Sequence, residues 1–317
     1  MYLTAEQLTQ SLDWSGLIKA LQTIFTTEVH SPVRHHHFID VPNTQQAALL
    51  LMPAWIEGKY LGVKQVSVFP GNNEKGKPGL TSLYTLSSGE TGETLAQMDG
   101  NIITARRTAA ASALASQYLS RPDSDSLLMI GAGRMGRYLV PAHMNVRPIK
   151  TVWIWDRNLA AAEQFAQDLR DQGHDAQAVT EQELASTAAQ AAIISCATLA
   201  KEPVLKGEWL RPGCHIDLVG SFTPTMREAD NAVLQQANVF VDTRAGALAE
   251  TGDLIIPINE GAFRADDIVA ELTELCSTQH KGRQALANAE DAITVFKSVG
   301  DSREDLAAAI MAFEATR

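Results

Sequence analysis

Lys64 is the first residue whose setting raises a question of chemistry. It lies in the run LGVKQVSVFPG, whose valines and phenylalanine are typical of a packed strand and whose Pro-Gly pair ends that strand. A buried ammonium group is costly unless it is paired. We therefore expect Lys64 either to extend its amino group to the surface, as an edge-strand lysine does, or to be held in place for chemistry.

A glycine-rich stretch, SLLMIGAGRMGRYLV, carries the strongest local motif. Gly131, Gly133 and Gly136 form G-x-G-x-x-G between an apolar strand and a helix. The first glycine permits a tight turn, the second lets the backbone approach a pyrophosphate, and the third lets the helix pack closely on the strand. We predict that this turn, including Arg134 and Met135, binds a dinucleotide.

The strand that follows, TVWIWDR, ends in an acidic and a basic residue. At Asp156 a carboxylate can accept hydrogen bonds from an adenosine ribose, and it would repel a 2′-phosphate, which favours NADH. Arg157 could pair with that phosphate, which favours NADPH. The two side chains act in opposite directions, so the choice between the two cofactors stays open.

Histidines 35–37 are consecutive and raise the question of a metal site. Neighbouring residues on a strand point to opposite faces, so only His35 and His37 could share a ligand. No Glu or Cys follows at ligand spacing, and no metal is predicted. Histidines that face outward or line a substrate pocket are the better interpretation.

The cysteines show neither a disulfide pattern nor a CxxC pair, and we expect packed thiols. They stand at positions Cys196, Cys214 and Cys276. Cys196 and Thr198 end a predicted strand, where the loops of a doubly wound fold line the cofactor.

The elements that position these residues change in type along the chain. Residues 3–25 have helical spacing with a capping-box pattern at Thr4 and Gln7, and residues 33–100 have short apolar runs broken by polar turns, as in antiparallel strands. The segment NIITARRTAAASALASQYLS favours a helix, followed by the link RPDSDS. From Leu127 apolar strands alternate with helix-length stretches, which predicts a parallel α/β sheet. The final segment, from residue 291, is interpreted as a turn and a helix, whose acidic residues in SREDLAAA are expected to be solvated.

Composition excludes several classes of protein. The 317 residues include 26 Lys and Arg against 37 Asp and Glu, a formal net charge of -11, so neither a nucleic acid nor an anionic membrane is expected as a partner. No apolar run is long enough to span a bilayer, and the first residues do not have the pattern of a secretory signal. The expected location is the cytoplasm.

Several separate motifs together resemble the ornithine cyclodeaminase/μ-crystallin family over nearly the whole chain. They are VKQVSVFPGNNEKGKPGL, SGETGETLAQMDGNIITARRTAAASALA, IGAGRMGRYL, PVLKGEWLRPGCHIDLVGS, VFVDTRAGALAETGDL and ITVFKSVG. The resemblance implies an α/β protein with a Rossmann domain for NADH or NADPH and an α+β N-terminal substrate domain that forms a homodimer by closing strands from two subunits. It places the substrate domain at residues 1–121, with the helix 300–317 returning to it, and the Rossmann domain at 122–299.

The same resemblance assigns roles to individual residues. Arg34, Lys64 and Arg107 fall on the positions that hold a substrate carboxylate. Thr108 is similar to a cofactor-phosphate contact and Ser298 to a contact near the nicotinamide.

One departure from the family pattern narrows the expected activity. The segment DLVGSFTPTMREAD matches the family pattern at Gly220, Pro224 and Glu228, but where cyclodeaminases have the acid of G-G-D-x-P this chain has Phe222. A phenyl ring transfers no proton, and cyclisation of ornithine needs an acid and a base. The resemblance is therefore closer to the branch that reduces Δ1-pyrroline-2-carboxylate to L-proline and Δ1-piperideine-2-carboxylate to L-pipecolate. The alternatives are an ornithine cyclodeaminase with another acid, a μ-crystallin-like NADPH-binding protein, and an amino-acid dehydrogenase acting on pyruvate and ammonia.

Overall fold

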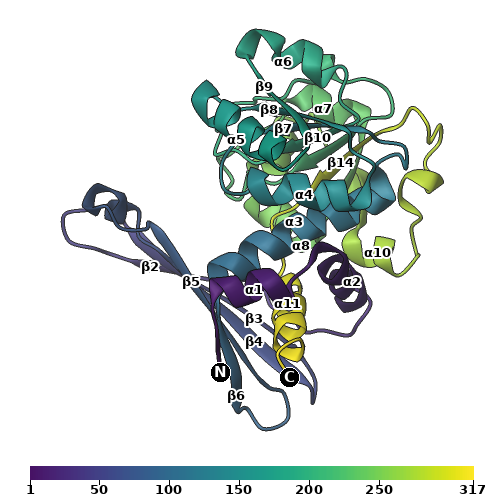
Figure 1. Cartoon of the computed structure of the whole chain (residues 1–317). Coiled ribbons are helices and arrows are strands. Elements are labelled where there is room, and N and C mark those ends of the chain that lie inside the picture. Colours follow the sequence, from purple (N-terminus) through teal and green to yellow (C-terminus); the bar gives the residue numbers. More distant parts are fainter. The chain divides into compact units, whose positions relative to one another are not determined.

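The computed structural model describes the backbone of residues 1–317 and every side chain except those of Asn73 and Glu74. The chain divides into two compact units, residues 1–108 with 301–317, and residues 109–300. Helix α3 (Gly100–Leu119) runs from the first unit into the second (Figure 1). The boundary therefore falls inside this helix, whereas the boundary expected from the sequence lies just after its end.

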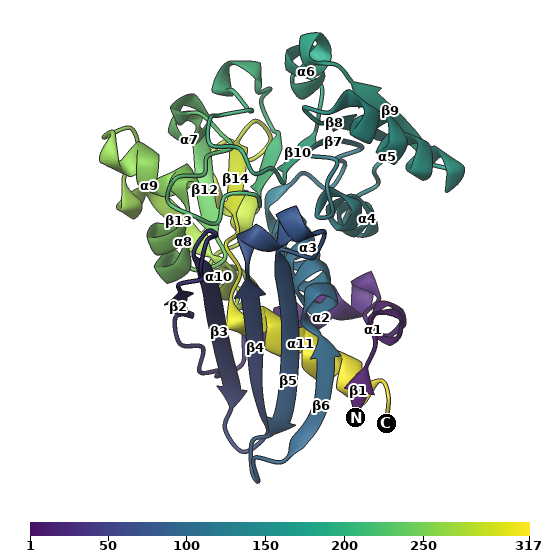
Figure 2. The same ribbon diagram turned by 90° about the vertical axis from the view of Figure 1, so that its left-hand side faces the viewer.

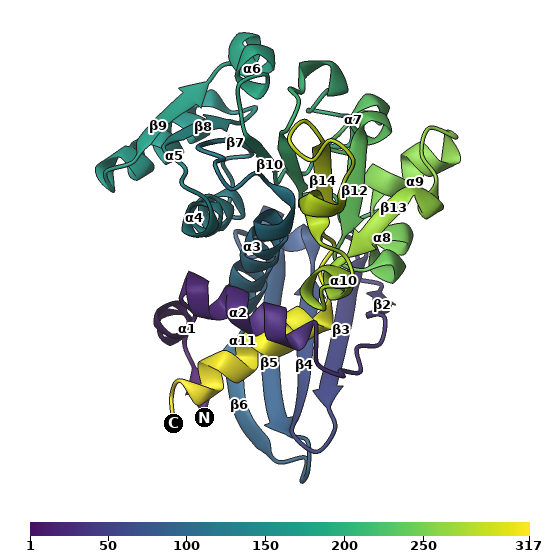
Figure 3. The ribbon, with the colours of Figure 1, turned by 90° about the vertical axis from the view of Figure 1, so that its right-hand side faces the viewer.

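The first unit is a mixed sheet with helices against it. Within the described residues, its six strands lie in the order β1-β6-β5-β4-β3-β2, antiparallel except that β1 runs parallel to β6 (Figure 2). Helix α11 packs on β3, β4 and β5 and on α2 (Figure 3). The elements are β1 (Tyr2–Leu3), α1 (Ala5–Ser11), α2 (Trp14–Ile24), β2 (His35–Ile39), β3 (Ala47–Ile56), β4 (Tyr60–Val68), the 3₁₀ helix η1 (Pro70–Lys75), β5 (Leu80–Ser88), β6 (Thr94–Asp99) and α11 (Ser302–Glu314).

Local sequence signals explain these elements. The capping box at Thr4 and Gln7 starts α1 as predicted, and the antiparallel strands follow the polar turns. Strand β4 lies between β3 and β5, so the edge-strand interpretation of Lys64 is wrong. Lys64 shares one face of β4 with the buried Gly62 and Val66, and this side chain is 1% exposed.

The second unit is a doubly wound parallel sheet. Its eight described strands lie in the order β13-β12-β14-β11-β10-β7-β8-β9, all parallel (Figure 1). They are β7 (Ser126–Ile130), β8 (Thr151–Trp155), β9 (Asp175–Val179), β10 (Ile193–Cys196), β11 (His215–Leu218), β12 (Ala237–Val241), β13 (Ile268–Glu271) and β14 (Ile293–Lys297). The helices are α4 (Gly136–Val146), α5 (Leu159–Asp171), α6 (Glu181–Ala188), α7 (Asn231–Gln236), α8 (Arg244–Glu250), α9 (Gly252–Asn259) and α10 (Leu272–Cys276), with 3₁₀ turns η2 (Gly207–Trp209), η3 (Ala265–Asp267) and η4 (Gly282–Ala285).

The predicted α/β class and Rossmann sheet are confirmed, with one correction near the C-terminus. Residues 291–300 were expected to form a turn, but β14 forms there and pairs with β11 and β12 inside the sheet. The strand order reverses between β7 and β10, because the chain leaves β7 toward β8 and β9 and later returns to the other side of β7. Ligands of such sheets bind at this switch point, beyond the carboxyl ends of the strands.

Candidate functional site

The glycine-rich turn lies at the switch point of the second unit, between β7 and α4. Gly131 has φ 115°, and a Cβ there would lie 2.7 Å from the carbonyl oxygen of Ala197. A Cβ on Gly136 would lie 2.3 Å from the carbonyl oxygen of Gly131, so helix and turn meet too closely for a side chain. A Cβ on Gly133 would meet nothing within 4 Å. The turn is thus tightly packed at its first and third glycines and open at the second, which fits a pyrophosphate at the start of α4.

Asp156, just after β8, is tied to this turn. Its Oδ2 accepts a hydrogen bond from the Ala132 N–H at 2.9 Å, and its Oδ1 accepts one from Asn158 N–H at 2.8 Å. A carboxylate oxygen has two acceptor positions, so each oxygen can still accept a ribose hydroxyl. Arg134 and Arg157 are exposed.

The turns after β10 and β11 are joined by a residue that the sequence did not single out as part of a site. This residue, Glu228, is fully buried. Its Oε1 accepts hydrogen bonds from the Thr198 N–H at 2.7 Å and from the Thr198 hydroxyl at 2.9 Å. Its Oε2 accepts a hydrogen bond from the Gly220 N–H at 2.6 Å. Two apolar side chains next to these turns face solvent, Leu199 at 78% and Phe222 at 52% exposed. The carboxyl edge of the sheet therefore has two polar backbone turns beside an uncovered apolar surface.

Two other residues expected near the cofactor are enclosed. Cys196 is fully buried, and burial, followed by the negative charge of Glu228, raises the pKa of its thiol well above the usual value. All three cysteines are buried and none is in a disulfide, so the prediction of packed thiols is confirmed. The Ser298 hydroxyl donates to Asp242 at 3.4 Å, within a turn whose N–H groups at Val299 and Gly300 also donate to that carboxylate.

In the first unit, two of the three expected substrate-binding cations form a buried cluster with two acids from α11. The Lys64 Nζ lies 2.8 Å from Asp305 Oδ1 and 2.7 Å from Oδ2. Arg107 donates from Nε to Asp305 Oδ1 at 2.9 Å and from Nη1 to Glu304 Oε2 at 2.5 Å. We call Lys64, Arg107, Glu304 and Asp305 the charged cluster; each is at most 4% exposed.

The two acids correct one expectation and balance the charges of the two cations. The acidic residues of SREDLAAA were expected to be solvated, but Glu304 and Asp305 are fully buried because α11 packs this face on β4 and β5. Two positive and two negative charges balance, which reduces the repulsion between Lys64 and Arg107. Burial lowers the pKa of Lys64 to about 8; Asp305 opposes this shift, and Arg107 and Arg34 add to it.

Arg34 lies close enough to this cluster to act on its charges. Besides its effect on Lys64, it lowers the pKa of His36, although burial is the larger cause of that shift. Tyr84 faces Lys64 across β4 and β5, and burial together with the charge of Asp305 raises the pKa of its hydroxyl well above the usual value. Thr108 is the last residue of the first segment of this unit and is half-buried on α3.

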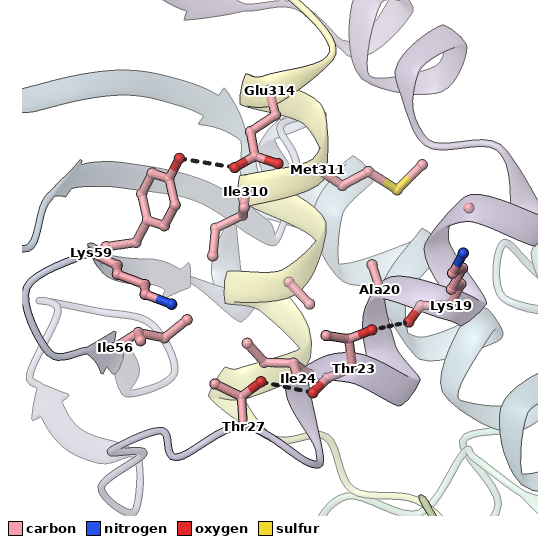
Figure 4. A pocket seen from close by; sticks show the side chains of 13 residues that line it. Lys19, Ala20, Thr23, Ile24, Thr27, Ile56, Lys59, Ile310, Met311 and Glu314 are labelled. Atoms are coloured by element: carbon pink, nitrogen blue, oxygen red, sulfur yellow. Dashed lines mark hydrogen bonds between the residues drawn. The ribbon is translucent and has the colours of Figure 1, made fainter.

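Two further features of the first unit are a groove beside α11 and the histidine run on β2. A groove of about 460 Å³ lies between α2, α11 and the hairpin of β3 and β4 (Figure 4). Ile24, Ile56 and Ile310 are among its apolar lining, and none of the residues assigned from the sequence lines it. The histidines of β2 are exposed, and among the described side chains no group of three His, Cys, Asp or Glu is placed to hold a metal ion. In the described part of the chain, no helix is long and apolar enough to cross a bilayer.

Comparison with known proteins connects both units to one family. The model of the ornithine cyclodeaminase/mu-crystallin family matches residues 1–317. The chain belongs to this family. Within it, the chain is 40% identical to a Delta(1)-pyrroline-2-carboxylate reductase of Colwellia psychrerythraea over 309 residues, which cover 97% of this chain and 96% of the relative.

Solved structures of the family share the whole fold. The Delta(1)-pyrroline-2-carboxylate reductase of Thermococcus litoralis, in complex with NADH and L-proline, matches with a TM-score of 0.90 and 34% identity, covering 100% of this chain and 97% of that chain. An archaeal alanine dehydrogenase dimer with bound NAD matches with a TM-score of 0.88 and 28% identity, covering 100% and 95%. Family members thus bind nicotinamide dinucleotides on this fold.

Proposed function

We propose that this chain is an NAD(P)H-dependent reductase of cyclic ketimine carboxylates, which forms L-proline from Δ1-pyrroline-2-carboxylate and L-pipecolate from Δ1-piperideine-2-carboxylate. The observation that carries the proposal is Phe222. Its exposed ring stands beside the turn after β11, where the family's cyclodeaminases have a proton-transferring acid. The identity to reductases of this name over nearly the full chain supports the same activity.

Three positively charged side chains of the first unit can bind and orient the substrate. In this proposal Arg34, Lys64 and Arg107 bind the carboxylate of the cyclic imine, and the planar guanidinium groups can do so with two hydrogen bonds. An ammonium group has three donors, so Lys64 can bind the substrate while it keeps its contact with Asp305. Fixing the carboxylate presents one face of the ring for reduction, and this orientation supplies much of the rate.

The dinucleotide site of the second unit supplies the reductant. A nicotinamide dinucleotide held there would supply the hydride that reduces C2 of the protonated imine. The turn from Gly131 to Gly136 holds the pyrophosphate in this proposal, and Asp156 holds the adenosine ribose. Phe222 gives the apolar ring of the substrate a surface to pack on and excludes water.

The test is NADH and NADPH oxidation in separate reactions with Δ1-pyrroline-2-carboxylate, with L-proline identified as the product. Parallel reactions contain L-ornithine with NAD and an ammonia readout. Oxidation with the imine and no ammonia from ornithine is expected. Ammonia from ornithine without imine reduction would mean that the chain is a lyase and that Phe222 does not decide the activity.

A second candidate is favoured by the similarity to the archaeal alanine dehydrogenase. A carboxylate-binding site for a cyclic imine can also bind pyruvate, whose imine with ammonia is reduced in the same way. Pyruvate with ammonia is therefore a further reaction in the same assay. A higher kcat/KM for this pair than for the cyclic imine would favour the dehydrogenase.

We also propose that the protein is a homodimer formed through the first unit. Strand β2 is the open edge of its sheet, and all its residues are exposed. Phe38 on this strand is 69% exposed, and Val33 just before it is 66% exposed. An open strand edge with exposed large apolar side chains is a surface that a second copy of the chain can cover.

A further inference from the structure

A buried group of three charged residues lies at the carboxyl edge of the parallel sheet, and the proposed reaction does not use it. Glu228 is in the loop after β11, Asp253 near the start of α9, and Lys297 at the end of β14; each is at most 1% exposed. Asp253 Oδ1 accepts the Glu228 backbone N–H at 2.7 Å, and its Oδ2 lies 3.3 Å from Lys297 Nζ. Lys297 Nζ also donates to the Leu218 carbonyl oxygen at 3.1 Å. The group therefore connects the loop after β11 to the last residues of β11 and β14.

Each oxygen of Glu228 holds a different turn. Oε1 accepts from Thr198, in the turn after β10, and Oε2 accepts from Gly220, in the turn after β11. The turns are close, since a Cβ on Gly220 would lie 2.1 Å from the Thr198 carbonyl oxygen and 2.4 Å from Glu228 Oε1. One carboxylate thus fixes the spacing of two backbone segments at the edge of the sheet where ligands bind.

Strand order indicates which end of a dinucleotide these turns would meet. Asp156, the proposed ribose ligand, follows β8, and the glycine-rich turn for the pyrophosphate follows β7. Strands β10 and β11 lie on the other side of β7 from β8. A dinucleotide that crosses the switch point therefore brings its nicotinamide half to the turns after β10 and β11.

We propose that Glu228 is a positioning residue for the nicotinamide half of the cofactor, and that its ionised form holds the two turns in the conformation that binds NADH. This inference rests on the proposed dinucleotide site. It adds a residue that acts through Thr198 and Gly220 rather than by touching the cofactor.

Protonation of Glu228 changes what the carboxyl group can hold. Burial, and then the charge of Asp253, raises the pKa of Glu228 to about 7, whereas Lys297 and the hydrogen bonds from Thr198 act in the opposite direction. The charged or titratable groups that face it are Asp253, Lys297 and the neutral thiol of Cys196. A protonated carboxyl group has lost its negative charge and one acceptor position, so the hydrogen bonds from Thr198 and Gly220 are no longer charge-assisted and become weaker. NADH binding should therefore strengthen as the pH rises through about 7.

The experiment compares the binding of NADH with that of ADP, which carries only the adenosine end. Glu228→Gln should weaken NADH binding by about tenfold or more, because charge-assisted hydrogen bonds are lost, and should leave ADP binding nearly unchanged. For the wild type, the dissociation constant for NADH should fall between about pH 6 and about pH 8, and for Glu228→Gln it should not. Glu163→Gln, an exposed change on α5, is the matched control and should behave as the wild type.

A second variant keeps the inference testable if Glu228→Gln does not fold. Asp253→Asn removes a negative charge beside Glu228, so the midpoint of the pH dependence of NADH binding should move to lower pH. An unmoved midpoint would overturn the inference. So would a Glu228→Gln variant that binds NADH as the wild type does, or one that loses NADH and ADP binding equally. Wild-type protein that binds neither ligand would instead overturn the dinucleotide site itself, and the inference with it.

Discussion

Replacing Asp305 by asparagine tests the charged cluster in the first unit most severely. Asp305 is fully buried and accepts from both cations, at 2.8 Å and 2.7 Å from the Lys64 amine and at 2.9 Å from the Arg107 Nε. Asp305→Asn leaves two buried positive charges with one acid, Glu304, and places an amide where both cations need an acceptor. Removing one partner of a buried ion pair costs about 3–5 kcal/mol.

A loss of this size is measurable by urea unfolding and by thermal melting. At about 2–4 °C per kcal/mol for a chain of a few hundred residues, the Tm should fall on the order of 10 °C. Glu314→Gln, an exposed change on the same helix that keeps an oxygen to accept the Tyr60 hydroxyl, should stay within about 0.5 kcal/mol of the wild type. Adding Lys64→Met to Asp305→Asn should cost less than the sum of the two single changes, because the second change removes a cation that lost its partner. An Asp305→Asn protein within about 1 kcal/mol of the wild type would refute the cluster as a coupled unit.

Three further predictions concern Lys64, the cofactor and the dimer. Lys64 binds a carboxylate only while it is charged, so kcat/KM for the imine should fall as the pH rises through about 8. The Lys64→Met variant should lose most of kcat/KM at any pH. A variant with nearly normal kcat/KM would contradict the role of Lys64. Asp156→Ala should weaken the binding of NADH and of ADP by about tenfold, and a loss confined to NADH would place this residue away from the adenosine ribose. Phe38→Glu should convert a dimer to monomers in a light-scattering measurement, whereas an unchanged molar mass would exclude β2 from the interface.

The sequence predicted those parts of the molecule that depend on neighbouring residues. The position of the glycine-rich turn between β7 and α4 could be predicted because the strand, the three glycines and the helix follow one another directly in the sequence. Lys64 could be recognised as unusual because its own strand is otherwise apolar. In each case the signal and the structure occupy the same short segment.

Pairings between distant residues could not be derived in this way. Lys64 and Asp305 are 241 positions apart, and the segment SREDLAAA by itself has the composition of a solvated helix start. Only packing of α11 on β4 and β5 makes these acids the partners of the two cations. Strand β14 was missed because its residues, ITVFK, include a threonine and a lysine, so the run is less apolar than SLLMI of β7, although all five residues are buried inside the parallel sheet.

The role of Glu228 in the site was not predicted, for a similar reason. The sequence shows one glutamate in a loop, and nothing in the segment TMREAD indicates that its oxygens reach the turns after two different strands. A buried carboxylate that accepts backbone N–H groups becomes visible only once the strand order is known.

The most direct test of the central claim follows the hydrogen itself. NADH or NADPH carrying deuterium at both C4 positions is incubated with the protein and Δ1-pyrroline-2-carboxylate, and the proline formed is examined by mass spectrometry and NMR. The account predicts L-proline with one deuterium at C2. Unlabelled proline, or no proline while L-ornithine releases ammonia, would contradict it.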